Sequence, residues 1–351
     1  MAFPVGHKHR VLIVVNKAYV GETLTDYPVL ITEKSLPRNI FYRARSDGGD
    51  IRATSDASGA TLIPIEMRLF DLTNKRIQIW VKRTLSTSIS MPIYIWYGEP
   101  STTALAKDDA NGCNNVWNSG FKGVWHLNEA GNGTAGEYID STVTNNGARG
   151  GGGTADKVPA QETNSFIGNS AVWTDTGQAI HIAIPQNAVY DFGTGQFTIE
   201  GFTKYTSGTA TAMWSNFASA GTGAVLRAQG NYLIFANFET VGVAAGSADT
   251  WQHWAVSRQA ANNIYIYLNG VQKSNGNSAS SITSTANNPN MGSQYKDIVT
   301  NTDGVFKLSS VRVSNTGRSA NWCKFTSDQA LSPTSVCELI RDDTMNMGFN
   351  L

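Results

Sequence analysis

Short apolar runs separated by polar turn residues dominate the hydrophobic pattern of the chain. In the stretch 76–82, Ile77, Ile79 and Val81 recur at every second position, so they lie on one face of an extended strand. Between such runs, SDGGD at 46–50 supplies the Ser, Asp and Gly that tight turns require. In the first hundred residues this pattern predicts strands at 11–15, 27–31, 41–45, 62–70, 76–82 and 92–97.

The second half of the chain continues the pattern of short strands. Two short stretches have helical character, 319–325 and 333–341, and the second has Ser332 as its N-cap and Pro333 as its first helical residue. Many short strands with turn signals between them favour a β-sandwich or jelly roll over alternating strands and helices. The predicted strands are 121–127, 171–173, 179–184, 196–205, 210–217, 224–228, 232–238, 251–257, 264–268 and 305–313.

The stretch 251–272 predicts a meander of three strands. A polar connection joins the first two runs, 251–258 and 264–268, and Asn269-Gly270 fits a two-residue turn whose central residues need positive φ. Because an isolated hairpin is only marginally stable in water, we expect its aromatic and aliphatic face to pack on a second sheet.

Chain length predicts the domain organisation. At 351 residues the chain exceeds the size at which a single core stops growing, which favours two domains. The fold class is all-β. We expect a small β-sandwich at 1–100, a linker at 101–115, a jelly-roll β-sandwich at 116–328, and a short helix with a tail at 329–351.

Composition limits the partners and the compartment. Lys plus Arg and Asp plus Glu number 27 each, which argues against nucleic acid and anionic membranes as partners. The longest aliphatic run near the start, 11–15, is too short for a signal-peptide core or a membrane span, so we expect neither a leader nor membrane insertion. The cysteines, Cys113, Cys323 and Cys337, are too scattered for a disulfide framework or a metal site.

Seven segments of the second half occur in an order that carries a family resemblance. They are GVWHLNE (123–129), DSTVTNNG (140–147), AIHIAI (179–184), FTIEGFTKY (197–205), WQHWAVSR (251–258), IYIYLNGVQ (264–272) and VRVSNTGRSANW (311–322). Together they resemble the laminin-G-like jelly rolls of the concanavalin A-like lectin/glucanase fold, over about 120–325. The last strand reads LSSVRVSN, where this family often has acidic residues before the arginine strand, so no role for such acids is carried over.

The first part of the chain carries a second resemblance. Its segments YPVLI (27–31), DIRATSDASGATLIPIE (50–66), IQIWVK (77–82) and PIYIWYGEPS (92–101) resemble a small β-domain of unknown function catalogued as DUF2341. That domain commonly stands directly upstream of such a jelly roll. The tandem implies a non-catalytic binding or structural module that is displayed on a surface.

Motifs for catalysis are missing from the sequence. A jelly-roll glucanase needs two carboxylates about 5–9.5 Å apart, commonly from Glu and Asp two residues apart on one strand, and no Glu-x-Asp occurs. Glu200 could pair across strands, but an isolated Glu on a strand is more often solvated or satisfied by a neighbour. No HExxH or GxSxG is present, and His126 and His253 are interpreted as structural. We therefore expect no enzymatic activity.

Calcium is the one cofactor that the resemblance brings into consideration, because laminin-G-like folds sometimes hold it through loop oxygens. Asp140, with Asn145 and Asn146 in the same loop, and Asp175 offer such oxygens. These acids do not repeat at coordinating spacing, so Asx turns are the preferred interpretation and no other metal is expected.

Carbohydrate binding would use exposed aromatic rings beside loop amides, because sugars stack their apolar C–H faces on aromatic planes. Trp173, Trp214 and Tyr138 adjoin polar loops, and Asn145 and Asn146 could bind hydroxyl groups. Most Trp residues in a sandwich of this size fill the core, so a core role is the other interpretation of these rings.

These expectations favour a non-enzymatic structural protein of a bacteriophage virion, either a capsid decoration or a tail component. Virion proteins assemble in the host cytoplasm, which suits a surface-type protein without a leader. We expect other virion proteins as partners, a symmetric homo-oligomer such as a trimer, and a glycan as a ligand of the outward jelly roll. The alternatives are a carbohydrate-binding adhesin of a tail fibre or bacterial cell surface and, less favoured, a glycan hydrolase. The segment 342–351 is either a tail or an arm to a neighbouring subunit.

Overall fold

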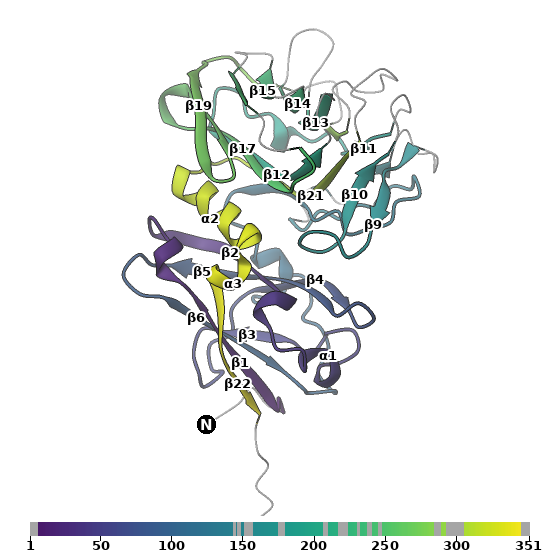
Figure 1. The fold of residues 1–351 in the computed structure, drawn as a ribbon, viewed down its shortest axis with the longest axis vertical. Helices are drawn as coiled ribbons and strands as arrows, with labels where there is room; N and C mark the ends of the chain where they lie inside the picture. The colour runs from purple at the N-terminus through teal and green to yellow at the C-terminus, as the bar shows by residue number, and fades with distance from the viewer. Residues whose placement is uncertain are drawn as a thin grey trace, which may run out of the picture. The chain divides into compact units, whose positions relative to one another are not determined.

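A computed structural model divides the chain into two compact units that are each built from β-sheets (Figure 1). Unit 1 comprises Met1–Ser119 together with Asp328–Leu351, and unit 2 comprises Gly120–Ser327. The architecture is all-β, as the strand pattern predicted. Among the described residues, no helix has the length and apolar character of a membrane span. The structure describes residues 6–142, 145, 149–150, 157–174, 180–205, 210–216, 224–229, 232–236, 241–244, 248–283, 289–292 and 305–344.

Unit 1 contains two antiparallel sheets within these ranges. Its strands are β1 His9–Val15, β2 Leu24–Thr32, β3 Arg52–Thr54, β4 Ile65–Asp71, β5 Arg76–Leu85, β6 Met91–Tyr97 and β22 Cys337–Thr344. The larger sheet has the order β22-β1-β6-β3, and the smaller one has the order β2-β5-β4. Apolar residues at alternate positions, such as Val11 and Ile13 of β1 and Ile77 and Ile79 of β5, are buried and form the core.

Short helical turns connect these strands. They are η1 Lys17–Tyr19, η2 Glu33–Ser35, α1 Ile40–Arg43 and η3 Cys113–Asn115. The segment 41–45, predicted as a strand, therefore lies largely in α1. Ile40 and Phe41 are both buried, and one helical turn can place two consecutive side chains on the same side, whereas successive residues of a strand point to opposite faces.

The segment 101–115, predicted as a linker, belongs to unit 1. The backbone N–H of Ile65 in β4 donates to the carbonyl of Asn111 at 3.0 Å, and Asn114 N–H donates to Lys107 O at 3.0 Å. The first bond attaches the segment to β4 of the smaller sheet, and the second closes a turn within the segment, so it is a structured part of the unit.

The C-terminal stretch returns to unit 1 as a strand. The helix predicted at 333–341 ends early, as α3 Pro333–Val336, and Ser332 stands at its N-cap without a side-chain capping bond. From Cys337 to Thr344 the chain forms β22, which pairs with β1 along its whole length. Pairing with β1 gives the backbone N–H and C=O groups on one edge of this segment hydrogen-bond partners. This long-range pairing stabilises the strand by more than the weak helical preference of the sequence stabilises a helix. Residues 337–344 of the predicted separate segment 329–351 are therefore part of the larger sheet of unit 1.

Arg10 of β1 forms an ion pair with Asp343 of β22. Its Nη2 lies 2.5 Å from Asp343 Oδ2, and its Nη1 donates to the carbonyl of Ala57 at 2.6 Å. The guanidinium group also lies over the Trp96 ring, 5.4 Å from the centroid. Only 6% of the Arg10 side chain and 16% of the Asp343 side chain are exposed, so the pair is shielded from water and from salt.

We expect Arg10→Met to lower the free energy of unfolding of unit 1 by about 2 kcal/mol, because hydrogen bonds to charged groups contribute about 1.5–3 kcal/mol. Urea denaturation of the full chain measures the change. Arg341→Met is the matched control: this arginine also contacts Asp343 but is 64% exposed, so its removal should cost less than about 1 kcal/mol. Equal losses for both variants would contradict this assignment.

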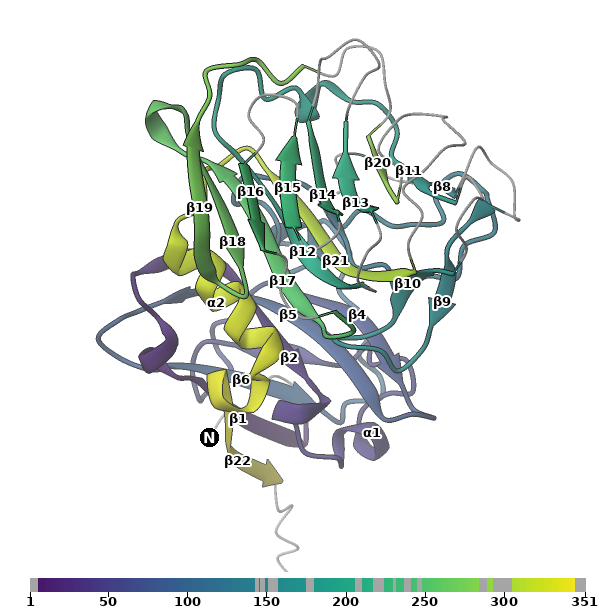
Figure 2. The same cartoon turned by 45° about the horizontal axis from the view of Figure 1, so that its top comes forward.

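Unit 2 contains two larger antiparallel sheets, which Figure 2 shows as two layers. In the described residues the eight-stranded sheet has the order β19-β18-β17-β12-β21-β10-β9, with β7 also paired to β21, and the seven-stranded sheet has the order β16-β15-β14-β13-β20-β11-β8. The strands are β7 Phe121–Trp125, β8 Arg149–Gly150, β9 Ala160–Glu162, β10 Ser170–Trp173, β11 Ile182–Ala183, β12 Phe197–Tyr205, β13 Ala210–Ser215, β14 Val225–Gln229, β15 Tyr232–Ala236, β16 Val241–Ala244, β17 Gln252–Arg258, β18 Asn263–Leu268, β19 Val271–Asn277, β20 Asn290–Met291 and β21 Phe306–Ser314. Two 3₁₀ turns, η6 Ala188–Tyr190 and η7 Ala260–Asn262, and the helix α2 Ala320–Leu331 complete the elements.

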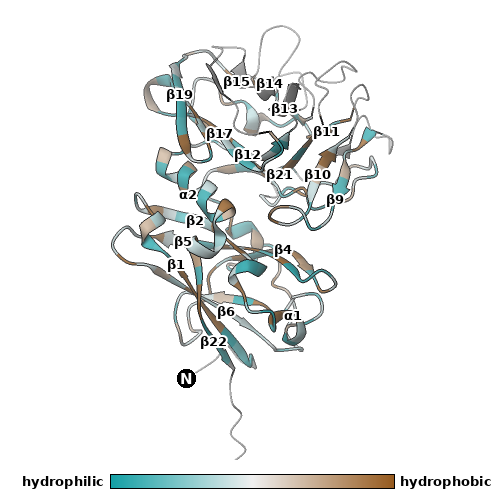
Figure 3. Cartoon of the chain, viewed as in Figure 1, coloured by the Kyte–Doolittle hydropathy of each residue, from teal (hydrophilic) through white to brown (hydrophobic). Residues whose placement is uncertain are grey.

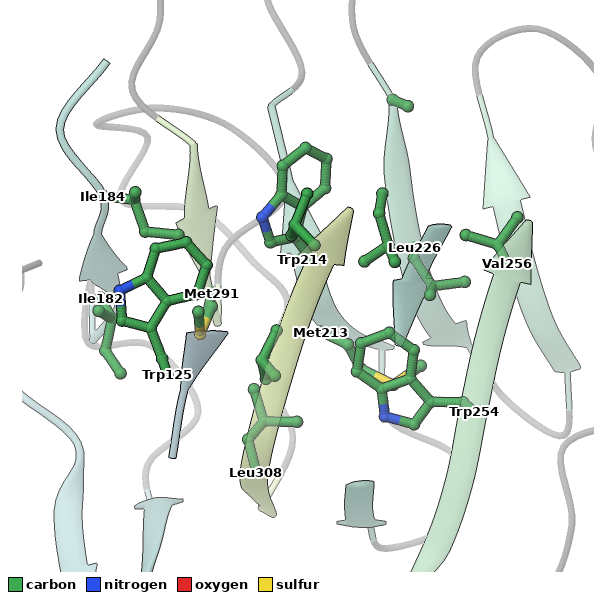
Figure 4. Packing of buried hydrophobic residues seen from close by; sticks show 14 of the residues in the cluster. Trp125, Ile182, Ile184, Met213, Trp214, Leu226, Trp254, Val256, Met291 and Leu308 are labelled. Carbon is green, nitrogen blue, oxygen red and sulfur yellow. The ribbon is translucent and has the colours of Figure 1, made fainter. Parts of the chain in front are cut away.

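The two sheets of unit 2 face each other across one hydrophobic core (Figure 4). Trp254 and Leu308 come from the eight-stranded sheet, and Met213, Trp214 and Met291 come from the seven-stranded sheet. All five are fully buried, and burial of such a side chain contributes roughly 2 kcal/mol. In Figure 3, β10 and β21 contain hydrophobic segments among hydrophilic ones, whereas the edge strand β19 is largely hydrophilic.

The predicted meander at 251–272 is present as β17, β18 and β19. Asn269 and Gly270 form its second turn with φ of 50° and 73°, as a two-residue turn between twisted strands requires. A Cβ at Gly270 would also lie 2.6 Å from the Cα of Lys324 in α2. Glycine is therefore needed here both for its backbone conformation and for the close approach of the helix.

Candidate functional site

The aromatic residues predicted as sugar-stacking surfaces lie inside unit 2. Trp173, Trp214 and Tyr138 are 2%, 0% and 1% exposed. Trp173 Nε1 donates to the carbonyl of Ile180 at 3.0 Å, and its ring stacks on Phe306 with the centroids 4.5 Å apart. A buried ring offers no face to a sugar. The expectation that these rings are exposed is therefore corrected: they fill the core.

Asp140, one of the calcium candidates, is the centre of a buried turn. Its Oδ1 accepts the backbone N–H groups of Val124 and Thr142, each at 2.9 Å, and its Oδ2 accepts that of Asn145 at 3.1 Å. Burial raises the pKa of this carboxyl group, although the hydrogen bonds that it accepts act in the opposite direction. Both oxygens face amide donors, so the site is an Asx turn, the interpretation that the spacing favoured.

Asn145 also serves the structure, because its side-chain amide donates to the carbonyl of Pro185 and is 3.4 Å from the Tyr190 hydroxyl. Asn146 and Asp175 lie outside the described residues. Within the described part of the chain, no group of three or more His, Cys, Asp or Glu side chains is placed to hold a metal ion.

Glu200 lies at the centre of a buried charge network on the outer face of the eight-stranded sheet, the face opposite the core. It stands on β12 directly opposite Arg312 on β21, with Glu200 Oε1 and Arg312 Nε 3.6 Å apart. His253 on β17 approaches from the other side, with its Nε2 3.4 Å from Glu200 Oε2. The three side chains are at most 2% exposed. Burial and, next to it, the charge of Glu200 raise the pKa of the Cys323 thiol in α2.

The network keeps Glu200 ionised. Burial by itself would raise the pKa of this carboxyl group, but the charges of Arg312, His253 and Arg318 outweigh it and lower the pKa to about 2. A glycoside hydrolase needs an accessible carboxylic acid whose pKa is raised so that it can protonate the leaving group. Glu200 is neither accessible nor protonated, so it cannot fill that role and instead compensates the buried arginine.

We expect Glu200→Gln to lower the free energy of unfolding of unit 2 by about 3–5 kcal/mol, because it leaves the buried Arg312 charge without its carboxylate. Thermal unfolding of the full chain measures the loss. Glu338→Gln is a control: this half-buried acid on β22 accepts a hydrogen bond from Asn16 in unit 1, so its substitution should leave unit 2 unchanged.

The pH dependence separates a charge effect from a packing effect in the same variant. Since the pKa of Glu200 is lowered from an ordinary 4.5 to about 2, its contribution is complete above pH 4.5 and is lost as the pH falls toward 2. The difference in melting temperature between the parent chain and Glu200→Gln should therefore shrink across that window. A constant difference from pH 7 to pH 2.5 would contradict the electrostatic assignment.

Farther along the same outer face, aromatic side chains reach the surface. Phe166, from the loop between β9 and β10, stacks on Trp251 with the ring centroids 5.1 Å apart and the planes at 12°. Phe166 also contacts the Phe202 ring at 5.4 Å, and Phe202 in turn lies 5.2 Å from the His253 ring. Phe202 and His253 are buried, whereas Phe166 and Trp251 are half-buried. We call Phe166 and Trp251 the aromatic pair.

Polar residues lie in the same loop as Phe166 and on the neighbouring strands. Lys307 on β21 forms an ion pair with Glu162 on β9, whose Oε2 accepts the Ser165 hydroxyl at 2.8 Å. Burial would raise the pKa of Glu162, but the ion pair and the serine hydroxyl bonds outweigh it and lower the pKa. Lys204 on β12 stands opposite Lys307 and is half-buried. Aromatic rings beside fixed polar groups are the composition of a carbohydrate site.

The aromatic pair was missed in the sequence, although a signal for it exists. Trp254 and Val256 belong to the core, so alternation along β17 places Trp251 and His253 on the opposite, outer face. The outward position of Trp251 could therefore be deduced from the alternation of residues in the sequence. The position of Phe166 depends on how the loop between β9 and β10 folds back over the sheet, which no local pattern indicates.

Unit 1 contains a hollow of about 220 Å³, and two of the polar residues that line it, Glu66 and Arg52, are already engaged. Glu66 accepts the Trp117 Nε1–H at 2.5 Å and lies 3.8 Å from Arg68 Nε. Arg52 donates to three backbone carbonyls, those of Gly49, Ile51 and Thr103. This internal pairing indicates no particular ligand. The hollow is lined by Gly48, Gly49, Ile51, Arg52, Ile65, Glu66, Met67, Arg68, Ala104, Leu105, Lys107 and Cys113.

Comparison with known families identifies the jelly roll. Residues 174–323 match a laminin-G family model described as the concanavalin A-like lectin/glucanases superfamily. This segment, less than half of the chain, is a concanavalin A-like lectin/glucanase domain, as predicted from the five of the seven sequence segments that lie within it. No curated protein matches the chain in sequence. The DUF2341 resemblance of the first part stays a prediction.

Solved structures with similar folds are distant. The binding domain of Paraclostridial Mosquitocidal Protein 1 has a TM-score of 0.46 at 8% identity, over 61% of this chain and 53% of that one. The receptor binding domain of botulinum neurotoxin D gives 0.45 at 10% identity, over 60% and 52%. That of botulinum neurotoxin type G gives 0.45 at 13%, over 60% and 51%. The chain thus spans about half of each of these domains, and likeness at this level does not bear on its ligand.

Proposed function

We propose that this chain is a non-enzymatic structural protein of a bacteriophage virion whose jelly roll binds glycans. The binding part of the proposal is supported by the family of the jelly roll and by the aromatic pair. The virion part is supported by the two-sandwich build and by a charged fraction of only 15%, which suits close packing in a repetitive particle.

The observation that carries glycan binding is the half-buried, stacked pair of Phe166 and Trp251 on a lectin-type jelly roll. The Phe166 contact fixes the orientation of the indole before any ligand arrives, so little side-chain entropy is lost when a sugar stacks on it. Lys204, Glu162 and Ser165 stand around the pair and offer both donors and acceptors to hydroxyl groups.

Two other functions follow from the same fold. A carbohydrate-binding adhesin of a tail fibre or of a bacterial cell surface would use the same aromatic pair and would differ only in where the chain is displayed. A glycan hydrolase is less favoured, because Glu200, the acid that the strand pattern singled out, is buried in its ion pair. Turnover of a polysaccharide that one Asp or Glu substitution abolishes would revive the hydrolase.

We expect Trp251→Ala to weaken glycan binding by roughly fivefold or more, because aromatic stacking of this kind contributes about 1 kcal/mol or more. A glycan array with the full chain identifies the ligand, and titration calorimetry gives the affinities. Tyr265→Ala is the matched control, since Tyr265 is also a half-buried aromatic on the same sheet but does not stack on Phe166.

Folding must be separated from binding in this experiment. Trp251→Phe keeps a ring over Phe166 and should retain most of the affinity, and the melting temperature of each variant shows whether unit 2 is intact. Binding that survives Trp251→Ala in a folded chain would contradict the role of the aromatic pair. A chain that binds no glycan on the array would contradict the lectin function itself.

For the virion part, we expect the chain to co-purify with intact phage particles at a fixed copy number and to form a symmetric homo-oligomer, such as a trimer, through contacts with capsid or tail proteins. Density-gradient purification followed by quantitative mass spectrometry measures the copy number. Recovery of the chain on bacterial cell envelopes and not in particles would favour the cell-surface adhesin.

A further inference from the structure

A lysine stands beside the aromatic pair. In the ladder between β12 and β17, Thr203 lies opposite Gln252, so the next residues outward, Lys204 and Trp251, are neighbours across the strands. The N–H of Asp249 donates to the carbonyl of Tyr205 at 2.8 Å, which holds the two chains together beyond the ladder. Alternation places both Lys204 and Trp251 on the outer face, because Tyr205 and Trp254 belong to the core.

Lys204 has a charged neighbour, Lys307, on the adjacent strand, and the two lysines differ in whether an acid pairs with them. Lys204 lies directly opposite Lys307, an arrangement of like charges that is unfavourable on a sheet. Lys307 is neutralised by Glu162. Within the described ranges, Lys204 takes part in no ion pair or side-chain hydrogen bond, and Asp249 is exposed, so solvent screens its carboxylate. A positive charge therefore stands next to the stacking surface without a partner among the described residues.

We propose that the aromatic pair and Lys204 form a site for a carboxylated sugar, a uronic or sialic acid, with the sugar ring stacked on Trp251 and its carboxylate on the Lys204 ammonium group. The inference rests on the proposed glycan binding and names the ligand chemistry of that same site. A carboxylate supplies the missing counter-charge and relieves the repulsion between Lys204 and Lys307, whereas a neutral sugar leaves both unchanged. The half-buried position of Lys204 makes this pair stronger than one formed in open solvent.

Two pairs of probes that differ in the carboxylate test the inference. Sodium oligogalacturonates are compared with their methyl esters, and 3′-sialyllactose is compared with lactose, by calorimetric titration of the full chain at low and moderate salt. We expect at least one acidic probe to bind about tenfold more tightly than its neutral partner, with an affinity that falls as salt rises. The two arms distinguish a uronic acid from a sialic acid.

Substitution of the lysine assigns the preference to the site. Lys204→Gln keeps most of the aliphatic stem and removes the charge, so it should reduce the acid preference to less than about twofold and abolish its salt dependence. Lys273→Gln, which removes an exposed lysine on β19 of the same sheet, is the matched control and should keep the full preference.

The outcomes separate this inference from the proposed function. Equal affinity for acidic and neutral probes, or an acid preference that persists in Lys204→Gln, would overturn the carboxylate site and leave glycan binding in place. Array binding confined to neutral glycans would do the same. If the chain binds neither these probes nor any glycan on the array, the proposed function fails together with the inference.

Discussion

The alternation of side chains along β12 determines which of its residues build the core of unit 2 and which form the outer face of the sheet. One set of its residues, Phe197 and Ile199 among them, faces the core, and the alternate set, Glu200, Phe202 and Lys204, faces outward. The outward set divides the face along the strand. In order along the strand, these are the buried acid Glu200, the aromatic ring of Phe202 and the half-buried Lys204. One strand therefore supplies part of the buried charge network and one edge of a candidate binding site.

The charge network is possible because all its members are paired at short range. A lone carboxylate beneath a helix would be protonated or would destabilise the fold, but Glu200 lies between Arg312 and His253 on the two neighbouring strands. Gly201 assists this arrangement, because a Cβ there would lie 3.0 Å from the Trp254 ring and 3.2 Å from the Cα of Val311. The strands thus approach closely enough for charges on adjacent strands to meet.

Alternation and turn chemistry predicted most strands and the meander around Asn269-Gly270, because these depend on neighbours in sequence. The segments 41–45 and 333–341 were misassigned because long-range contacts decide them: Phe41 stacks against Phe70, and Cys337–Thr344 pairs with β1. The prediction of the sugar-stacking residues was wrong for a related reason. Trp173 and Trp214 were selected by their proximity to polar loops, but exposure depends on strand parity and on the second sheet. Parity would have pointed to Trp251, whereas only the folded loop brings Phe166 onto it.

The path of the chain also constrains how its function can be studied. Unit 1 is discontinuous, since residues before Ser119 and after Asp328 build it together, and the last turn of α2 belongs to it: Gln329 Oε1 accepts the N–H of Leu30 at 2.9 Å, and Gln329 Nε2 donates to the Tyr27 hydroxyl at 3.0 Å. The residues of α2 up to Ser327 therefore belong to unit 2, and those from Asp328 onward belong to unit 1. A cut between the two would remove β22 from β1 and would end α2 before its last turn, so a fragment would report on a damaged helix as well as on its ligand. Binding measured on the full chain avoids this ambiguity, because there both ends of α2 keep their partners.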